Sequence, residues 1–176
     1  LLQPSGGKMK VENNINLEKY TQATALKDGS MINLRAIRVD DQEKLSAFIN
    51  RLSDRSKYLR FSGITTFTPE DARRNATVDY HDRFAIVAIR GEGTDEKIIG
   101  VGRYHRIDNS NKAETFAVVE DSYQKMGIGT HLFVMLAYAA KERGIDFFEV
   151  EILRENTEVI KTMQRSGLEL VGKSEK

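Results

Sequence analysis

The chain has 176 residues, and its 27 lysine and arginine residues nearly balance its 26 aspartate and glutamate residues, which leaves a net charge of +1. This balance gives no overall attraction to nucleic acid or to an anionic membrane, so neither is expected as a partner. Cysteine is absent, which excludes disulfides, thiolate metal sites and cysteine nucleophiles, and no apolar run reaches the roughly 18 residues of a membrane span.

One cytoplasmic α/β domain is predicted, because the chain has about the size of a single domain and no recognisable signal peptide. Residues 1–27 lack hydrophobic periodicity and are expected to be a flexible lead-in to a domain over residues 28–176. Apolar residues between Met31 and Val39 predict the first strand. Asp40 or Asp41 is then expected to cap a helix. The apolar residues that follow at helical spacing are Leu45, Phe48, Ile49 and Leu52.

A second helix is predicted between residues 68 and 79. Thr68 is a typical N-cap, Pro69 fits the first helical position, and Asp71 follows three residues after the cap. Between the two helices the pattern predicts a break at residues 53–56 and a short element at residues 57–61.

Three strands joined by short turns follow and predict an antiparallel meander. They are expected at residues 84–89, 97–106 and 113–119. Beyond them the pattern alternates between helix and strand. The expected elements are a helix at 127–142, a strand at 146–153, a helix at 156–166 and a short strand at 168–171. The predicted fold class is therefore α/β with a mixed sheet, in which an antiparallel half precedes a β-α-β-α-β half.

The junction between the strand at 113–119 and the next helix carries the clearest chemical signal. Gly127 and Gly129 lie there, one residue apart. The first backbone N–H groups of a helix have no partner within the helix, and the helix dipole attracts anions to that end. Glycines would let a phosphate approach the backbone, so an anion site is predicted. The alternative is that these glycines only allow close packing of the helix.

Other phosphate and catalytic motifs fit less well. The third glycine of a dinucleotide-binding fingerprint is missing, since Leu132 occupies its place. Residues 167–174 match Gly-x4-Gly-Lys-Ser literally, but they follow a helix and lack the helix that a P-loop requires after it. His81, His105 and His131 are scattered, and no metal site is predicted.

The segment Gln124-Lys125-Met126-Gly127-Ile128-Gly129 resembles the Gln/Arg-x-x-Gly-x-Gly/Ala loop of the GCN5-related N-acetyltransferase (GNAT) family. The order of the predicted elements is similar to that fold over residues 28–172. Two further stretches, at residues 28–41 and 51–61, are similar to the bacterial protein-lysine acetyltransferase branch.

This resemblance implies transfer of an acetyl group from acetyl-CoA to an amine by direct attack in a ternary complex. It implies a slot for the thioester between splayed central strands, at residues 113–119 and 146–153. It assigns cofactor contacts to Val118, Val119, Glu120, Gln124, Lys125, Met126, Gly127, Ile128, Gly129, Thr130 and Asn156. The implied partners are acetyl-CoA and a protein or small-molecule amine, with no metal, in a monomer or homodimer.

An amine acceptor needs a general base, because a lysine ammonium has a pKa of about 10.4 and cannot attack until it loses a proton. Glu114 lies on the strand that leads into the glycine loop, at a place similar to that of the base in the resembled enzymes, and is the predicted catalytic residue. An ordinary strand carboxylate is the alternative reading of Glu114, and Glu120 is the second candidate base.

Two features depart from the family pattern. Met163 stands seven residues after Asn156, where many members have a tyrosine that acts as general acid. The end of the chain leaves room for one last strand but not for the family's usual final hairpin.

Acceptor-site candidates are Tyr58, Arg60, Arg103 and His105. A small-amine or ribosomal-protein N-terminal acetyltransferase, and a non-catalytic acyl-CoA-binding module, remain alternatives.

Overall fold

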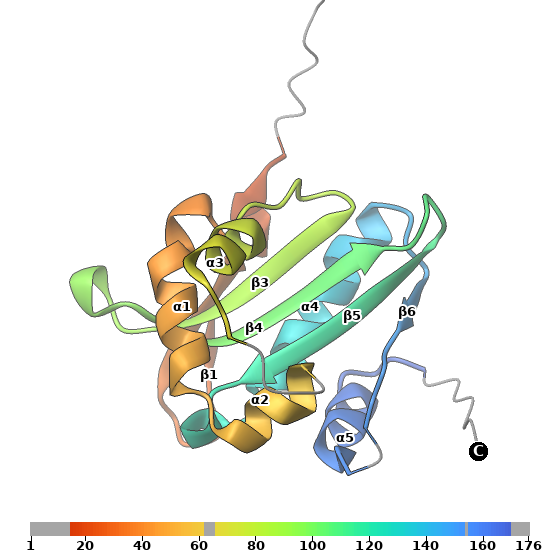
Figure 1. Ribbon diagram of the computed structural model, residues 1–176. Coiled ribbons are helices and arrows are strands. Elements are labelled where there is room, and N and C mark those ends of the chain that lie inside the picture. The colour runs from red at the N-terminus through yellow and green to blue at the C-terminus, as the bar shows by residue number, and fades with distance from the viewer. Residues whose placement is uncertain (1–14, 62–65, 154, 170–176) are drawn as a thin grey trace, which may run out of the picture.

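The computed structural model describes residues 15–61, 66–153 and 155–169, and a six-stranded sheet lies at its centre (Figure 1). The strands lie side by side in chain order. They are β1 (Gln22–Ala25), β2 (Met31–Ala36), β3 (Arg83–Arg90), β4 (Lys97–Arg106), β5 (Lys112–Val119) and β6 (Phe147–Glu149). Strands β1 to β5 pair antiparallel, whereas β6 pairs with β5 in parallel. The predicted mixed sheet, antiparallel first and parallel at its end, is confirmed.

Helices cover both faces of this sheet. The α-helices of the described residues are α1 (Gln42–Arg51), α2 (Asp54–Phe61), α3 (Pro69–Ala76), α4 (Ile128–Glu142) and α5 (Thr157–Arg165). The short 3-10 helices are η1 (Leu17–Tyr20), η2 (Val39–Asp41), η3 (Gly93–Asp95) and η4 (Asp121–Tyr123). Helices α1 and α3 lie on one face and α4 on the other (Figure 1). No helix in the described ranges is long and apolar enough to cross a membrane.

The continuous apolar sequence of β3 follows from its place between these layers. Phe84, Ile86 and Ala88 face the core beneath α4, together with Leu132 and Leu136 of that helix. The alternate residues Ala85, Val87 and Ile89 face the core beneath α1, with Leu45 and Phe48. Side chains on a strand alternate between the two faces, so a strand covered on both sides is apolar throughout.

Strand β4 lets α4 approach the sheet closely because it carries Gly100 and Gly102. A Cβ atom on Gly102 would lie 2.9 Å from Leu136 Cδ1 and 3.2 Å from Leu132 Cβ. On Gly100 the nearest atom would be Ile128 Cγ2, at 3.2 Å. The two glycines therefore set how closely α4, and with it the glycine loop at its start, lies against the sheet.

The N-terminal prediction needs correction. Part of the segment expected to be a flexible lead-in, residues 1–27, forms η1 and the edge strand β1. Tyr20 is fully buried, and its hydroxyl donates to Glu142 and accepts from Arg143 Nη1 at 2.7 Å, at the end of α4. Strand β1 has only one buried residue, Thr24, so its sequence has no hydrophobic alternation to reveal it.

Several element boundaries also differ from the sequence predictions. Most of the break predicted at 53–56 and the short element at 57–61 form one helix, α2, which begins at Asp54, and the helix at 68–79 ends at Ala76. The strand expected at 146–153 is reduced to β6. Leu168 and Glu169 are not in a strand, and the rest of the expected strand at 168–171 lies outside the described residues. The capping box of Thr68 and Asp71, with Pro69 in the first turn, is as predicted.

We expect Gly102→Ala to lower the free energy of unfolding by about 1–3 kcal/mol, the usual cost of overpacking a core, because the added methyl group meets α4. Urea denaturation measures the loss. Gly100→Ala is the graded comparison and should cost less, because its closest contact is longer. Equal stability of wild type and Gly102→Ala would show that α4 is free to move away from β4.

Candidate functional site

The parallel pairing of β5 and β6 stops part-way along β5. The paired residues are Lys112–Phe147, Ala113–Phe148 and Glu114–Glu149. From Thr115 to Val119, β5 remains paired with β4, while the chain after Glu149 leaves the sheet. Within the part of the chain that the structure describes, the backbone edge of β5 is therefore open from Thr115 onward, and Glu114 lies at the point where the two strands separate.

The glycine loop follows the open end of β5 and leads directly into α4. Lys125 and Gly127 have left-handed backbones, with φ of 63° and 95°, and Gly127 is the N-cap of the helix. Among the described residues, no acceptor receives a hydrogen bond from the backbone N–H groups of residues 125–130. His131 donates to the Gly127 carbonyl at 3.2 Å and so begins the helical bonding. The loop therefore presents unpaired donors at the positive end of a helix dipole.

The two glycines of this loop serve different purposes. A Cβ atom on Gly127 would meet nothing within 4 Å, so this position is open, and its positive φ is what favours glycine. A Cβ atom on Gly129 would lie 3.0 Å from Thr162 Cγ2, on α5. Close packing, the alternative considered for both glycines, therefore accounts for Gly129, whereas Gly127 leaves room for a ligand.

A network of side-chain hydrogen bonds fixes the loop to the α1–α2 connection. Asp121 accepts from the Ser53 backbone N–H at 2.9 Å, from Ser53 Oγ at 2.7 Å and from Ser56 Oγ at 2.9 Å. Gln124 Nε2 donates to Ser56 Oγ at 3.2 Å and to the Val119 carbonyl at 3.0 Å. Burial opposes ionisation of Asp121, but the hydrogen bonds from Ser53 and Ser56 outweigh it and lower the pKa of this carboxyl.

Sequence reasoning missed Ser53, Ser56 and Asp121. The first two lie in the stretch at 51–61, whose similarity to the protein-lysine acetyltransferase branch gave a signal without assigning them a role. Their partner Asp121 is more than 60 residues away in the chain. No local pattern pairs residues at such a separation, so only the fold brings them together.

Glu120, the second candidate base, is buried and already paired. Its Oε2 accepts from Arg51 Nε at 3.1 Å, while its backbone N–H donates to the Ile99 carbonyl at 2.9 Å. Arg51 also donates to the Ile98 carbonyl, so the pair ties the end of β5 to α1 and β4. These contacts give Glu120 a structural role at the end of β5.

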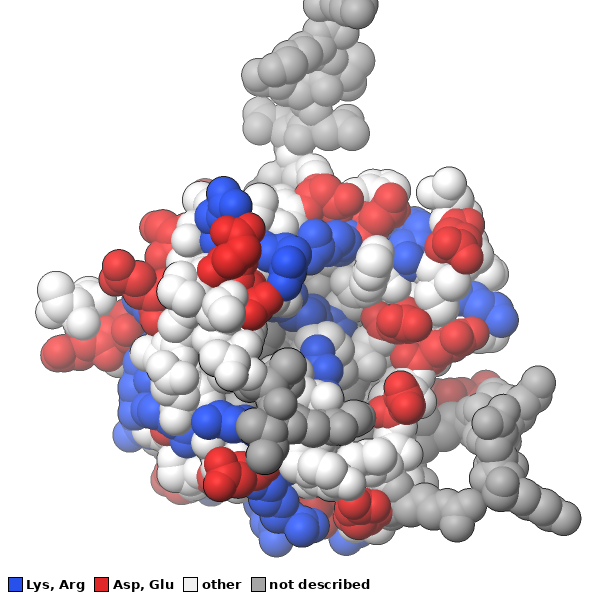
Figure 2. All heavy atoms as spheres, viewed as in Figure 1, with Lys and Arg blue, Asp and Glu red and all other residues white. Residues whose placement is uncertain are grey.

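Glu114, in contrast, is exposed and makes no ion pair within the described ranges. Glu114 is paired with His105 of β4, and His105 is paired with Arg83 of β3. The three side chains therefore share one face of the sheet. Glu114 borders a cavity between these strands and α2 and α3. Figure 2 shows basic side chains inside this hollow and acidic side chains along its rim.

The remaining predicted positions lie near α5. Asn156 is the residue before the helix, half-buried, and its side chain makes no capping hydrogen bond. Met163, at the position where a tyrosine was considered, is buried in the core beneath α4. Gly167 follows α5 in a left-handed backbone, and most of the P-loop-like match at 167–174 lies outside the described residues. The described part of the chain has no group of three or more metal-ligating side chains.

Comparison with known proteins gives a consistent result. The family model described as "Acetyltransferase (GNAT) domain" matches residues 32–169. Acetyltransferase PA5475 of Pseudomonas aeruginosa is 30% identical over 68% of this chain and 65% of its own length. Acetyltransferase Pat of Mycolicibacterium smegmatis is 29% identical over 81% of this chain but only 42% of its own length. This chain therefore spans less than two thirds of either relative.

A solved structure agrees with these sequence matches. The crystal structure of the GNAT domain of S. lividans PAT superposes with a TM-score of 0.78 at 32% identity, and covers 85% of this chain and 88% of that one.

We expect Asp121→Asn to lower stability at neutral pH and to reduce the loss of stability in acid. The pKa of Asp121 is lowered in the folded state, so its carboxylate stabilises the protein above the unfolded pKa of about 3.9 and loses that effect as the pH falls through the lower folded pKa. Denaturation between about pH 5 and pH 2 should therefore show a smaller decrease for the variant than for wild type. Asp95→Asn, in the exposed 3-10 helix η3, is the control. Parallel pH profiles for Asp121→Asn and wild type would contradict the assignment.

Proposed function

This chain belongs to the GNAT family of acetyltransferases, and we propose that it transfers the acetyl group of acetyl-CoA to the ε-amine of a protein lysine. The observation that carries the proposal is the arrangement along β5. An exposed carboxylate lies where β5 and β6 separate, and unpaired backbone donors lie at the other end of the same strand. A single extended ligand could contact both.

The glycine loop is the proposed site for the pyrophosphate of acetyl-CoA. Backbone N–H groups at a helix start bind phosphate without any cationic side chain, and the open Cβ position of Gly127 leaves the approach clear. The pantetheine arm would follow the open edge of β5, next to Val118 and Val119. Asn156, whose side chain makes no capping hydrogen bond, would contact the arm from the other wall of the slot. This arrangement directs the thioester toward Glu114.

The proposed base is Glu114. Its carboxylate takes a proton from the lysine ammonium, directly or through a water molecule. The neutral nitrogen then attacks the thioester carbonyl carbon, the C–S bond breaks, CoA leaves as a thiolate, and the nitrogen releases its second proton to water as the amide forms. Met163 offers no proton, and a thiol pKa near 8.5 allows the thiolate to depart and take its proton from water. Because the chain has no cysteine, direct transfer is the route that its residues support.

The choice of a protein lysine as acceptor rests on the protein acetyltransferase relatives. The similarity to the GNAT domain of S. lividans PAT is the strongest support, since it extends over most of both chains. A small-amine or N-terminal acceptor on the same fold is the competing reading. Acetylation assays with lysine peptides, free polyamines and peptides with a free N-terminus distinguish these acceptors.

We expect Glu114→Gln to reduce kcat/KM by roughly 10²- to 10⁴-fold, because the amide cannot accept the proton, with little change in acetyl-CoA affinity. A steady-state assay and calorimetric titration measure the two effects. Glu149→Gln alters the neighbouring carboxylate, which is paired with Lys112, and should have a much smaller effect. Full activity of Glu114→Gln, or an equal loss of activity in Glu149→Gln, would show that Glu114 is not the general base.

We expect Gly127→Asp to weaken acetyl-CoA binding at least about tenfold more than Gly127→Asn does. Both side chains tolerate a left-handed backbone and have nearly the same size, so the difference isolates the repulsion between a carboxylate and the pyrophosphate. Calorimetric titration of each folded variant measures the affinities. Equal affinities would place the pyrophosphate away from this loop.

A further inference from the structure

The cavity beside Glu114 has a volume of about 210 Å³ and is rich in arginine. Its lining includes Arg60 from α2, Arg83 from β3, Arg103 from β4 and Phe116 from β5. The strand register explains how they converge. Arg83, His105 and Glu114 are paired with one another across β3, β4 and β5. Two residues away along β4 and β5, Arg103 is paired with Phe116. Side chains two residues apart on a strand share a face, so all five side chains point from the same face of the sheet.

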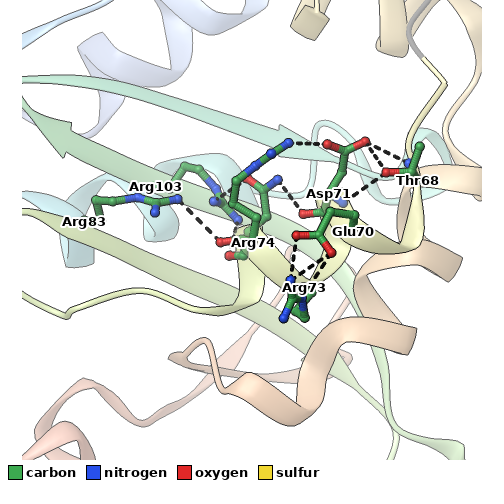
Figure 3. Close-up of polar contacts among 8 residues, drawn as sticks. Thr68, Glu70, Asp71, Arg73, Arg74, Arg83 and Arg103 are labelled. Carbon is green, nitrogen blue, oxygen red and sulfur yellow. Dashed lines mark hydrogen bonds and ion pairs between the residues drawn. The ribbon is translucent and has the colours of Figure 1, made fainter.

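These arginines lack the carboxylate partners that nearby arginines have. On α3, Arg73 pairs with Glu70 and Arg74 pairs with Asp71 (Figure 3). Arg103 instead donates to Asn75 Oδ1 at 2.8 Å and to the Asn75 carbonyl at 3.1 Å.

Arg83 reaches only the backbone carbonyl of Arg74, at 3.5 Å. Within the described residues, neither Arg83 nor Arg103 forms an ion pair. No carboxylate of the described ranges therefore neutralises the guanidinium groups of these two arginines.

The third arginine, Arg60, adds to this charge. Its guanidinium lies over the Phe116 ring, and its Nε is buried without a hydrogen-bond partner in the described part of the chain. Burial, with added repulsion from Arg103, lowers the pKa of Arg60 to about 9. Burial and repulsion from Arg83 lower the pKa of Arg103 to about 10. With these values Arg60 and Arg103 remain cations at neutral pH, and both would be stabilised by a bound anion.

We propose that this cavity binds a carboxylate of the acceptor, from an aspartate or glutamate close to the reactive lysine. Guanidinium groups bind carboxylates through paired N–H donors, and such charge-assisted hydrogen bonds are among the strongest in proteins. Glu114 borders the same cavity, so an acceptor held by its carboxylate would place its amine beside the base. This inference rests on the proposed function and specifies its substrate: lysines in acidic surroundings.

The phosphates of acetyl-CoA are a less suitable occupant. The glycine loop begins after Val119, and a strand advances about 3.3 Å per residue, so the loop lies roughly 17 Å or more along β5 from Glu114. A CoA molecule with its thioester at Glu114 and its pyrophosphate at the loop has its phosphates at the far end of the strand. The arginine cavity is then left to the acceptor.

The test uses two blocked peptides that differ only beside the lysine, Gly-Glu-Lys-Glu-Gly and Gly-Gln-Lys-Gln-Gly. We expect the glutamate peptide to have a kcat/KM roughly ten- to a hundredfold higher, as charge-assisted hydrogen bonds allow. Arg103→Gln should remove most of this preference by lowering kcat/KM for the glutamate peptide. Arg73→Gln, which removes the same charge from α3 outside the cavity, should keep the preference.

A direct binding measurement separates this inference from the proposed function. Glutarate is titrated into ¹⁵N-labelled protein, and the Nε–H signals of Arg60 and Arg103 are followed, with chloride at equal ionic strength as control. Saturable shifts that are abolished by Arg103→Gln would support the anion site. If such shifts occur but neither peptide is acetylated, the lysine acceptor is refuted and the anion site stands. Equal kcat/KM for the two peptides, or shifts no larger than with chloride, would overturn the inference.

Discussion

The short parallel contact between β5 and β6 is the constraint on which the rest of the site depends. Only three residue pairs join the two strands, and the pairing ends at Glu114. Had β6 continued beside β5, its backbone would have occupied every donor and acceptor on that edge. Because it leaves, one strand carries a free backbone edge, with a carboxylate at its start and a helix N-terminus at its end.

Holding such an edge open requires support from the other side of β5. Strand β4 supplies it by pairing along β5 as far as Val119, and α4 packs closely on β4 where Gly100 and Gly102 leave space. The polar contacts of Asp121 with Ser53 and Ser56 then fix the turn between β5 and α4. These contacts hold the loop in place, while its backbone donors at residues 125–130 have no partner among the described residues.

The molecule prepares two different environments for negative charge, although its net charge is only +1. At the glycine loop the donors are backbone N–H groups, which no count of charged residues detects. In the cavity beside Glu114 they are guanidinium groups without carboxylate partners in the described ranges. On α3, by contrast, Arg73 and Arg74 are paired with Glu70 and Asp71.

The fold and the loop could be predicted from sequence wherever the signal was local. The meander followed from short turns between apolar runs, and the capping box at Thr68 followed from residue spacing. The prediction failed where tertiary contacts decide. Val150 and Ile152 looked like strand residues, yet they pack on the core outside any strand. Asp41 is the N-cap of α1 as predicted, but its carboxylate binds Arg35 at 2.7 Å and 2.8 Å instead of capping the helix.

The sequence by itself therefore determined the order of the elements from β2 to α5, the mixed sheet and the position of the glycine loop, because periodicity, capping and glycine spacing act over a few residues. The candidate base, Glu114, came from the resemblance to the family. Only the tertiary structure decided that Gly129 packs on Thr162 while Gly127 stays open, and that Glu120 is held by Arg51. It also brought Arg60, Arg83 and Arg103 to one cavity. The physical reason is that charges and donors act through space, so their partners depend on which distant segments the packed core places side by side.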